Sequence, residues 1–241
     1  MAKKDWFKLW FNTSYYHTLY KHRNFTEAQD FMLHLVSYLS FNKEDLLLDA
    51  ACGKGRHSIY LNSLGFNVIG VDLSKKSIEY AQKFKNEKLH FVEHDMRNPF
   101  KRKYQAILNL FTSFGFFEDD EEDIRILKNF KNALNSGGVA VIDFMNSKKV
   151  KANLIANEVQ IIDNIEFNIS RYIEDKFIVK EINFKADGKK HKYFEKVKSL
   201  ELPKIKSYME SVGFNIKYIF GDYKLNSFDA ETSDRLILVV E

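Results

Sequence analysis

A short apolar run that leads into a glycine turn is the feature that most constrains the fold of this chain. Residues 46–48 are three leucines, Asp49 follows them, and the turn contains Gly53 and Gly55. Three consecutive leucines between polar residues favour a strand that is covered on both faces. Glycine permits a tight turn and lets a ligand approach the backbone, and a helix starting at Arg56 would direct free N–H groups at that ligand. The stretch therefore predicts a strand, a turn and a helix of an α/β fold.

Further apolar stretches repeat the strand pattern along the chain. Asp72 ends the strand predicted within 67–74, Asp95 ends the strand predicted within 89–97, and two more strands are predicted at 104–111 and 138–144. Ligands of open α/β sheets bind beyond the carboxyl ends of the strands, and an acid after the second strand can accept hydrogen bonds from both hydroxyls of a ribose. Three acids at successive strand ends therefore indicate a nucleotide-like ligand.

This arrangement, over roughly residues 46–145, resembles the class I S-adenosylmethionine-dependent methyltransferases. Ala51 replaces the first glycine of the family's motif I, and we expect a β-like backbone there. The resemblance implies a Rossmann-like α/β fold, with a seven-stranded, mostly parallel sheet, an antiparallel final hairpin and helices on both faces. Ser58 stands at the third glycine of the dinucleotide fingerprint, which disfavours a nicotinamide-dependent oxidoreductase.

The resemblance also implies a site for S-adenosyl-L-methionine, with S-adenosyl-L-homocysteine as the product. Asp72 would hold the ribose and Asp95 the adenine amino group, while Met96 would pack on the adenine ring. Asn109 and Leu110 would flank the methionine part through backbone groups. The residues expected at the cofactor are Asp49, Ala51, Gly53, Gly55, Asp72, Leu73, Asp95, Met96, Asn109, Leu110, Tyr20 and Arg23.

The first 25 residues contain many aromatic side chains, unlike a disordered tail. One interpretation is a helix packed on the edge of the sheet. The other, which the resemblance favours, is an aromatic lid (about 1–25) over the cofactor and the acceptor. A base near the acceptor would keep an attacking amine neutral, and the candidates are Tyr16, His17 and Asp143, with no catalytic residue assigned.

The segment after the fourth predicted strand, 109–117, is rich in phenylalanine. It is similar to the loop that closes the pocket of small-molecule N-methyltransferases, so we expect some of its rings in the core and others at the pocket. The chain lacks the N-P-P-Y box of enzymes that methylate amino groups of nucleic acids. Both observations favour a small-molecule acceptor.

Residues 147–200 depart from the α/β pattern. Alternation at 165–170, further strand-like stretches at 176–184 and 193–200, and the hairpin signal Asp187-Gly188 predict a small antiparallel β insertion near the acceptor site. Residues 1–145 and 201–241 would then form the methyltransferase domain. The insertion is rich in lysine, but aromatic interleaving is sparse, which favours a solvated hairpin over a nucleic-acid surface.

Composition narrows the class of protein. The net charge of +4 over 241 residues is too small to indicate a nucleic-acid partner. Cys52 is the only cysteine, and no apolar run approaches the roughly 20 residues of a membrane span. We therefore expect a cytoplasmic monomer or homodimer without a membrane partner. The acidic run 119–123 predicts a solvated helix start, since consecutive acids on a helix cannot converge on a metal.

The function expected from the sequence is transfer of a methyl group from S-adenosylmethionine to a small-molecule amine or hydroxyl. In-line displacement of this kind depends mainly on proximity and orientation. The alternatives are a methyltransferase acting on RNA or protein, and a protein that binds S-adenosylmethionine without catalysis.

Overall fold

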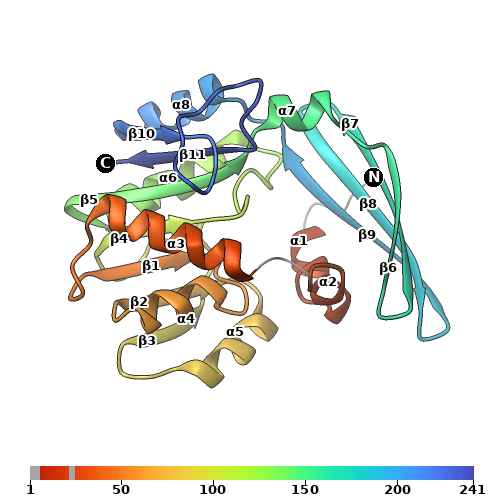
Figure 1. The fold of residues 1–241 in the computed structure, drawn as a ribbon, viewed down its shortest axis with the longest axis horizontal. Helices are drawn as coiled ribbons and strands as arrows, with labels where there is room; N and C mark the ends of the chain where they lie inside the picture. The colour runs from red at the N-terminus through yellow and green to blue at the C-terminus, as the bar shows by residue number, and fades with distance from the viewer. Residues whose placement is uncertain (1–5, 22–24) are drawn as a thin grey trace.

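A computed structural model describes residues 6–21 and 25–241 (Figure 1). Its central sheet has seven strands in the order β10-β11-β5-β4-β1-β2-β3. Strands β1 to β5 run parallel, and β11 pairs antiparallel with both β5 and β10, as predicted. The strands are β1 (Leu46–Ala50), β2 (Asn67–Asp72), β3 (Leu89–Glu93), β4 (Tyr104–Asn109), β5 (Leu134–Met145), β10 (Ile216–Phe220) and β11 (Arg235–Val240).

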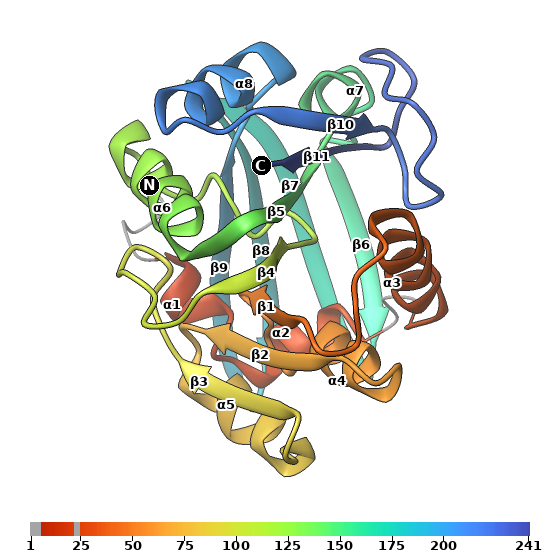
Figure 2. The ribbon, with the colours of Figure 1, turned by 90° about the vertical axis from the view of Figure 1, so that its left-hand side faces the viewer.

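Helices cover both faces of this sheet (Figure 2). The first face is covered by α6 (Asp120–Ala133) and α8 (Leu202–Ser211), and the second by α3 (Phe25–Leu39), α4 (Arg56–Ser63) and α5 (Lys75–Ala81), which the short 3-10 helix η1 (Gln82–Phe84) follows. The predicted acidic helix start is present, because Asp119 caps α6 and four acids occupy its first turn. Such acids are favourable at the positive end of a helix dipole.

The predicted β insertion is a second, antiparallel sheet with the order β6-β7-β8-β9. Asp187 and Gly188 turn between β8 and β9 with φ of +50° and +71°, as expected for a two-residue hairpin loop. Asp163 and Asn164, with φ of +49° and +61°, form a second such turn. The strands are β6 (Asn157–Ile162), which the sequence analysis missed, β7 (Ile165–Glu174), β8 (Phe177–Ala186) and β9 (Lys189–Lys198).

The aromatic N-terminal segment packs on the insertion sheet. It forms α1 (Trp6–Trp10) and α2 (Ser14–Leu19), which lie between the carboxyl edge of the central sheet and the insertion (Figure 1). Its core is shared with β7 and β8, and large side chains of both parts are buried in it: Trp6, Phe7, Trp10, Leu19, Phe167, Ile169, Ile182 and Phe184. The interpretation of a helix on the edge of the central sheet is therefore wrong.

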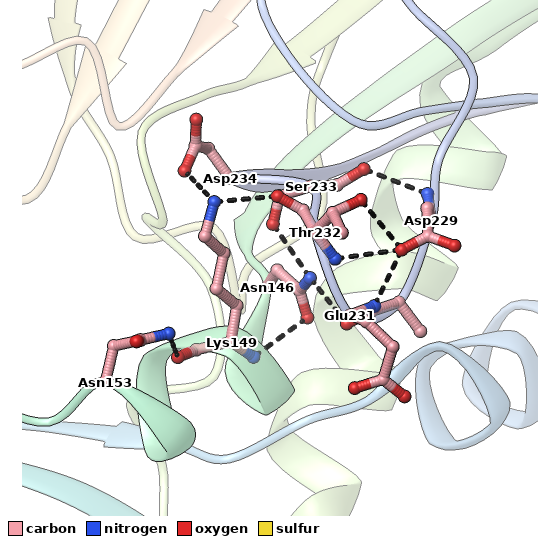
Figure 3. Close-up of polar contacts among 9 residues, drawn as sticks. Asn146, Lys149, Asn153, Asp229, Glu231, Thr232, Ser233 and Asp234 are labelled. Carbon is pink, nitrogen blue, oxygen red and sulfur yellow. Dashed lines mark hydrogen bonds and ion pairs between the residues drawn. The ribbon is translucent and has the colours of Figure 1, made fainter.

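The insertion is also tied to the final strands of the central sheet. Helix α7 (Ser147–Ala152) follows β5, and its capping residue Asn146 donates from Nδ2 to the carbonyls of Ala230 and Ser233, at 2.9 and 2.8 Å (Figure 3). Lys149 Nζ donates to the Thr232 carbonyl at 2.7 Å. These bonds hold the 221–234 loop, between β10 and β11, against the start of the insertion.

A buried ion pair joins the insertion to helix α6. Lys198, at the end of β9, is 1% exposed, and its Nζ lies 2.6 Å from Asp123 Oδ2 and 2.7 Å from Asp120 Oδ1. Asp123 is fully buried. The Lys198 backbone N–H also donates to the Gly115 carbonyl, so one residue fixes the insertion beside the loop that follows β4. In the two described ranges, no helix is long and apolar enough to cross a membrane.

Replacing Lys198 by methionine should lower the free energy of unfolding by about 3–5 kcal/mol, because Asp123 would become a buried charge without its partner. Lys176→Met is the matched control, since Lys176 is half-exposed and also contacts Asp120, and it should cost about 1 kcal/mol or less. Urea unfolding of both variants measures the difference. Equal losses would show that the burial of Lys198 is unimportant.

Candidate active site

A cavity of about 1380 Å³ lies between the carboxyl edge of the central sheet, the segment α1–α2 and strand β9. Sites for one drug-sized ligand typically measure about 300–1,000 Å³. The cavity therefore has room for two ligands. Of the residues predicted at the cofactor, those that line it are Asp49, Ala51, Gly53, Asp72, Leu73, Asp95, Met96, Leu110 and Tyr20. The predicted Arg23 lies outside the described residues.

The turn after β1 contains three residues in the left-handed region. Ala51, Gly53 and Gly55 have φ of +64°, +56° and +83°. The expectation of a β-like backbone at Ala51 is therefore wrong, and a left-handed conformation costs a non-glycine residue about 1–2 kcal/mol. At Gly53 a Cβ would meet no atom within 4 Å, so the backbone there is open to a ligand.

Gly55 is required by packing and does not line the cavity. A Cβ on it would lie 2.6 Å from the Phe91 ring of β3. The residue lets α4 begin close to the sheet, which differs from the direct cofactor contact expected from the sequence. Its contribution to a ligand is thus indirect, through the position of the helix start.

Asp49, at the end of β1, is 1% exposed and holds the start of α4. Its Oδ2 accepts hydrogen bonds from the Ser58 backbone N–H at 3.1 Å and from Ser58 Oγ at 2.5 Å. Burial raises the pKa of Asp49 to about 6, although the bonds from Ser58 act in the opposite direction. Ser58, which stands at the third glycine position of the dinucleotide fingerprint, is thus the hydrogen-bond partner of Asp49, the acid of motif I.

Asp72, at the end of β2, joins two loops at the cavity wall. Its Oδ2 accepts from the Gly53 N–H at 2.8 Å and its Oδ1 from the Ser74 N–H at 2.7 Å. Burial raises the pKa of Asp72, and these two bonds partly oppose that effect. A carboxylate has about four lone-pair positions, so two remain for donors of a ligand.

The acid after β3 has a guanidinium partner. Asp95 Oδ2 lies 2.6 Å from Arg97 Nη2, and Arg97 Nε lies 3.0 Å from Oδ1. Burial raises the pKa of Asp95, but the bonds from Arg97 outweigh burial and keep the pKa below its ordinary value. Asn109 Nδ2 contacts the neighbouring Met96 Sδ at 3.5 Å and donates to the Ala50 carbonyl at 3.1 Å. Asn109 is fully buried and does not itself line the cavity.

The loop after β4 begins with two strained residues. Phe111 and Thr112 have φ of +56° and +61°, which is unusual for a residue other than glycine and most costly for β-branched threonine. Asp143 compensates, because its Oδ2 accepts from the Phe111 N–H at 2.8 Å and its carbonyl accepts from the Thr112 N–H at 3.0 Å. Of the phenylalanines in this segment, Phe114 is buried, while Phe111, Phe116 and Phe117 line the cavity, as expected.

Asp143 does not have the surroundings of a catalytic base. Its carboxylate is fully buried, does not line the cavity, and pairs with Arg235, whose Nε lies 2.8 Å from Oδ1. Tyr223 Oη also donates to it, at 3.3 Å. The structure therefore gives Asp143 the role of holding the loop, in place of the basic role suggested by the sequence.

The N-terminal candidates Tyr16, His17 and Tyr20 all line the cavity. Burial, together with the positive charge of Lys54, lowers the pKa of His17 to about 4. Its imidazole is therefore neutral at pH 7 and only a weak base. The Tyr20 hydroxyl lies 2.7 Å from Glu195 of β9 and accepts a hydrogen bond from Lys180 Nζ at 2.6 Å.

Glu195 and Arg235 are among the charged cavity residues that the sequence analysis did not place at the site. Glu195 accepts from Trp10 Nε1 at 2.8 Å as well as from Tyr20. The alternation of Tyr193, Glu195 and Val197 along one face of β9 is the signal that could have placed it. No local pattern marks Arg235, because its position depends on β11 lying beside β5.

Comparison with known proteins agrees with this geometry. Residues 47–138 match the family model described as a methyltransferase domain. The chain carries a methyltransferase domain. The dTDP-3-amino-3,4,6-trideoxy-alpha-D-glucopyranose N,N-dimethyltransferase of Streptomyces venezuelae is 32% identical over 99 residues, which are 40% of this chain and 41% of that protein. The chain matches less than half the length of the curated relatives compared with it.

Solved structures show that the methyltransferase domain has the class I fold. An S-adenosylmethionine-dependent methyltransferase from Clostridium acetobutylicum superposes with a TM-score of 0.79 at 21% identity, over 94% of this chain and 95% of that one. S-adenosylmethionine-bound CalS10, an amino pentose methyltransferase from Micromonospora echinaspora, gives a TM-score of 0.70 at 18% identity, over 95% and 96%. The likeness includes the insertion, since it extends over nearly the whole chain.

Ala51→Gly should raise the free energy of unfolding by about 0.5–1 kcal/mol, because relief of the left-handed strain exceeds the extra entropy of glycine in the unfolded chain. The control is Ala50→Gly. Ala50 ends β1 and is 1% exposed, so this change should destabilise by about 1 kcal/mol. Thermal or urea unfolding distinguishes them, and a destabilised Ala51→Gly would contradict the strain at this residue.

Asp49→Asn should become more stable relative to the wild type as the pH rises from about 4 to 7. The folded pKa of Asp49 is raised from 3.8 to about 6, so the folded wild type binds more protons than the unfolded chain in this window and loses stability with rising pH. The amide does not titrate, and the shift corresponds to about 3 kcal/mol. Urea unfolding at several pH values measures it, and parallel curves for the two proteins would exclude the effect.

Proposed function

We propose that the protein transfers a methyl group from S-adenosylmethionine to a small-molecule amine or hydroxyl. This proposal rests on one observation. Asp49, Asp72 and Asp95, at the ends of three successive strands, all line the same cavity. The volume of about 1380 Å³ accommodates an acceptor beside the cofactor. The names of the relatives, which include methyltransferases acting on amino sugars, support an acceptor of this class.

The residues present fit the cofactor. Asp72 has lone pairs for the ribose hydroxyls after its bonds to Gly53 and Ser74, and the open space at Gly53 leaves its backbone accessible. Asp95 and Met96 border the same cavity for the adenine, and Leu110 for the methionine part. When bound, S-adenosylmethionine supplies a methyl group on a sulfonium, which is electrophilic without further activation.

The chain contributes binding, orientation and exclusion of water. The segment α1–α2 acts as a lid in this proposal, because it reaches the cofactor half of the cavity: Ser74 Oγ donates to Asn12 Oδ1 at 2.6 Å. Bonds from Trp10 and Tyr20 to Glu195 close the segment against the insertion. His17, neutral at pH 7, and Tyr16 remain candidates for accepting a proton from the acceptor.

The cavity lining and the single cysteine bear on the class of acceptor and on the compartment. The aromatic rings that line the cavity favour a small acceptor over RNA or protein, for which we would expect a broader basic face. The single cysteine, Cys52, is buried, which fits a protein of the reducing cytoplasm. We propose a monomer or a homodimer without a nucleic-acid partner.

Calorimetric titration with S-adenosylmethionine, S-adenosylhomocysteine and NAD tests the proposal. The first two should bind and NAD should not, and an assay for S-adenosylhomocysteine release should detect turnover with members of an amine and hydroxyl panel. Tight binding without turnover across the panel would favour a cofactor-binding protein. Binding of NAD alone would overturn the proposal.

Asp72→Ala should weaken S-adenosylmethionine affinity about 10–150-fold, because hydrogen bonds to a charged group contribute about 1.5–3 kcal/mol. The matched control is Glu93→Ala. Glu93 on β3 lies opposite Asp72 of β2 in the strand register, but it is exposed and does not line the cavity. Its removal should therefore leave the affinity unchanged. Calorimetry gives both constants, and equal affinities of wild type and Asp72→Ala would exclude the ribose contact.

A further inference from the structure

Arg235 is a cavity cation that lies far from the three acids. It begins β11 and pairs with Met145 at the end of β5. In the sheet order, β11 is three places from β1 and four from β2. Neighbouring strands lie about 4.8 Å apart, so the β11 position is roughly 14 Å from the end of β1 and roughly 19 Å from that of β2. Arg235 therefore belongs to the half of the cavity away from the proposed ribose and adenine contacts.

The guanidinium of Arg235 is fixed in orientation by two bonds. Its Nε donates to Asp143 Oδ1 at 2.8 Å, and its Nη2 donates to Thr112 Oγ1 at 2.9 Å. Asp143 and Thr112 are themselves locked, because Asp143 is buried and holds the strained turn at Phe111 and Thr112. An arginine side chain with so little freedom loses little entropy when it binds a ligand.

Donors remain on this side chain after those bonds. Arginine has five N–H groups, and the two bonds of Arg235 use two of them. Within the described ranges, Nη1 has no hydrogen-bond partner, while the side chain is 18% exposed and lines the cavity. The remaining N–H groups suit the two oxygens of a carboxylate or a phosphate.

We propose that Arg235 binds an anionic group, a carboxylate or a phosphate, on the methyl acceptor. This rests on the proposed methyl transfer. The acceptor is then an anionic small molecule whose negative group lies at the β11 side of the cavity, so that its amine or hydroxyl faces the cofactor half. Thr112, whose Oγ1 accepts a hydrogen bond from this guanidinium, borders the same space. Arg235 is in this view a specificity-determining residue, and Asp143 orients it.

Binding of two probe anions, acetate and inorganic phosphate, tests the site in protein saturated with S-adenosylhomocysteine. At least one should bind the wild type, as measured by calorimetry or ligand-observed NMR. Arg235→Gln should reduce that affinity at least tenfold. Since this variant leaves Asp143 as a buried charge without its cation, the double variant Arg235→Gln/Asp143→Asn is measured beside it and should show the same loss of anion binding.

Lys224→Gln is the control for general charge. Lys224 is exposed and lines the same cavity, so it contributes to the overall potential without a fixed geometry. An equal loss in Lys224→Gln would overturn the proposal, as would anion affinity that survives in the folded double variant. Competition between the anions and S-adenosylhomocysteine would assign Arg235 to the cofactor and also overturn it.

Turnover of paired amines gives the second readout. Glycine should be methylated at least tenfold more efficiently than methylamine in the wild type, or phosphoethanolamine more efficiently than ethanolamine, and Arg235→Lys should reduce that preference. The absence of a preference in both pairs contradicts an anionic acceptor. Failure of S-adenosylmethionine to bind at all would instead contradict the proposed function, so the two failures are distinguishable.

Discussion

The contact between Asp49 and Ser58 is the interaction on which the cavity depends. It is buried, and it fixes the first turn of α4 to the end of β1 through both the backbone and the side chain of Ser58. The turn between β1 and α4 is held in place as well, because Gly55 lies against the Phe91 ring. From that turn the Gly53 N–H reaches Asp72, so the ends of β1 and β2 are joined before any ligand is present. A preorganised polar wall of this kind reduces the ordering cost of binding.

The sequence predicted the parts of the fold that local patterns encode. Apolar runs, acids at strand ends and glycine turns identified the parallel strands, and Asp187-Gly188 identified a hairpin. It did not predict the left-handed backbone of Ala51, because residue type restricts φ but does not determine it. Strand β6 was missed for a similar reason: its turn, Asp163-Asn164, is a weaker signal than one that contains glycine.

Site residues that depend on tertiary neighbours were predicted least well. Asp143 looked like a candidate base from its place near the carboxyl end of a predicted strand. Its structural role becomes visible only in the fold, where Arg235 and the Phe111 N–H contact it. Glu195 and Arg235 are ordinary charged residues in the sequence. They become cavity residues because β9 is held against α6 by Lys198 and because β11 inserts beside β5. Such placements follow from chain topology, which pattern alone does not supply.

The aromatic core that joins α1 and α2 to the insertion has a consequence for synthesis of the protein. Trp6, Phe7 and Trp10 leave the ribosome before their partners Phe167 and Phe184, which follow more than 150 residues later. Until then these rings cannot reach their native environment, and exposed apolar surface on a nascent chain favours aggregation and capture by chaperones. Contacts of such large sequence separation also slow folding. The segment that borders the cavity is therefore translated long before its packing partners and is among the last parts to fold.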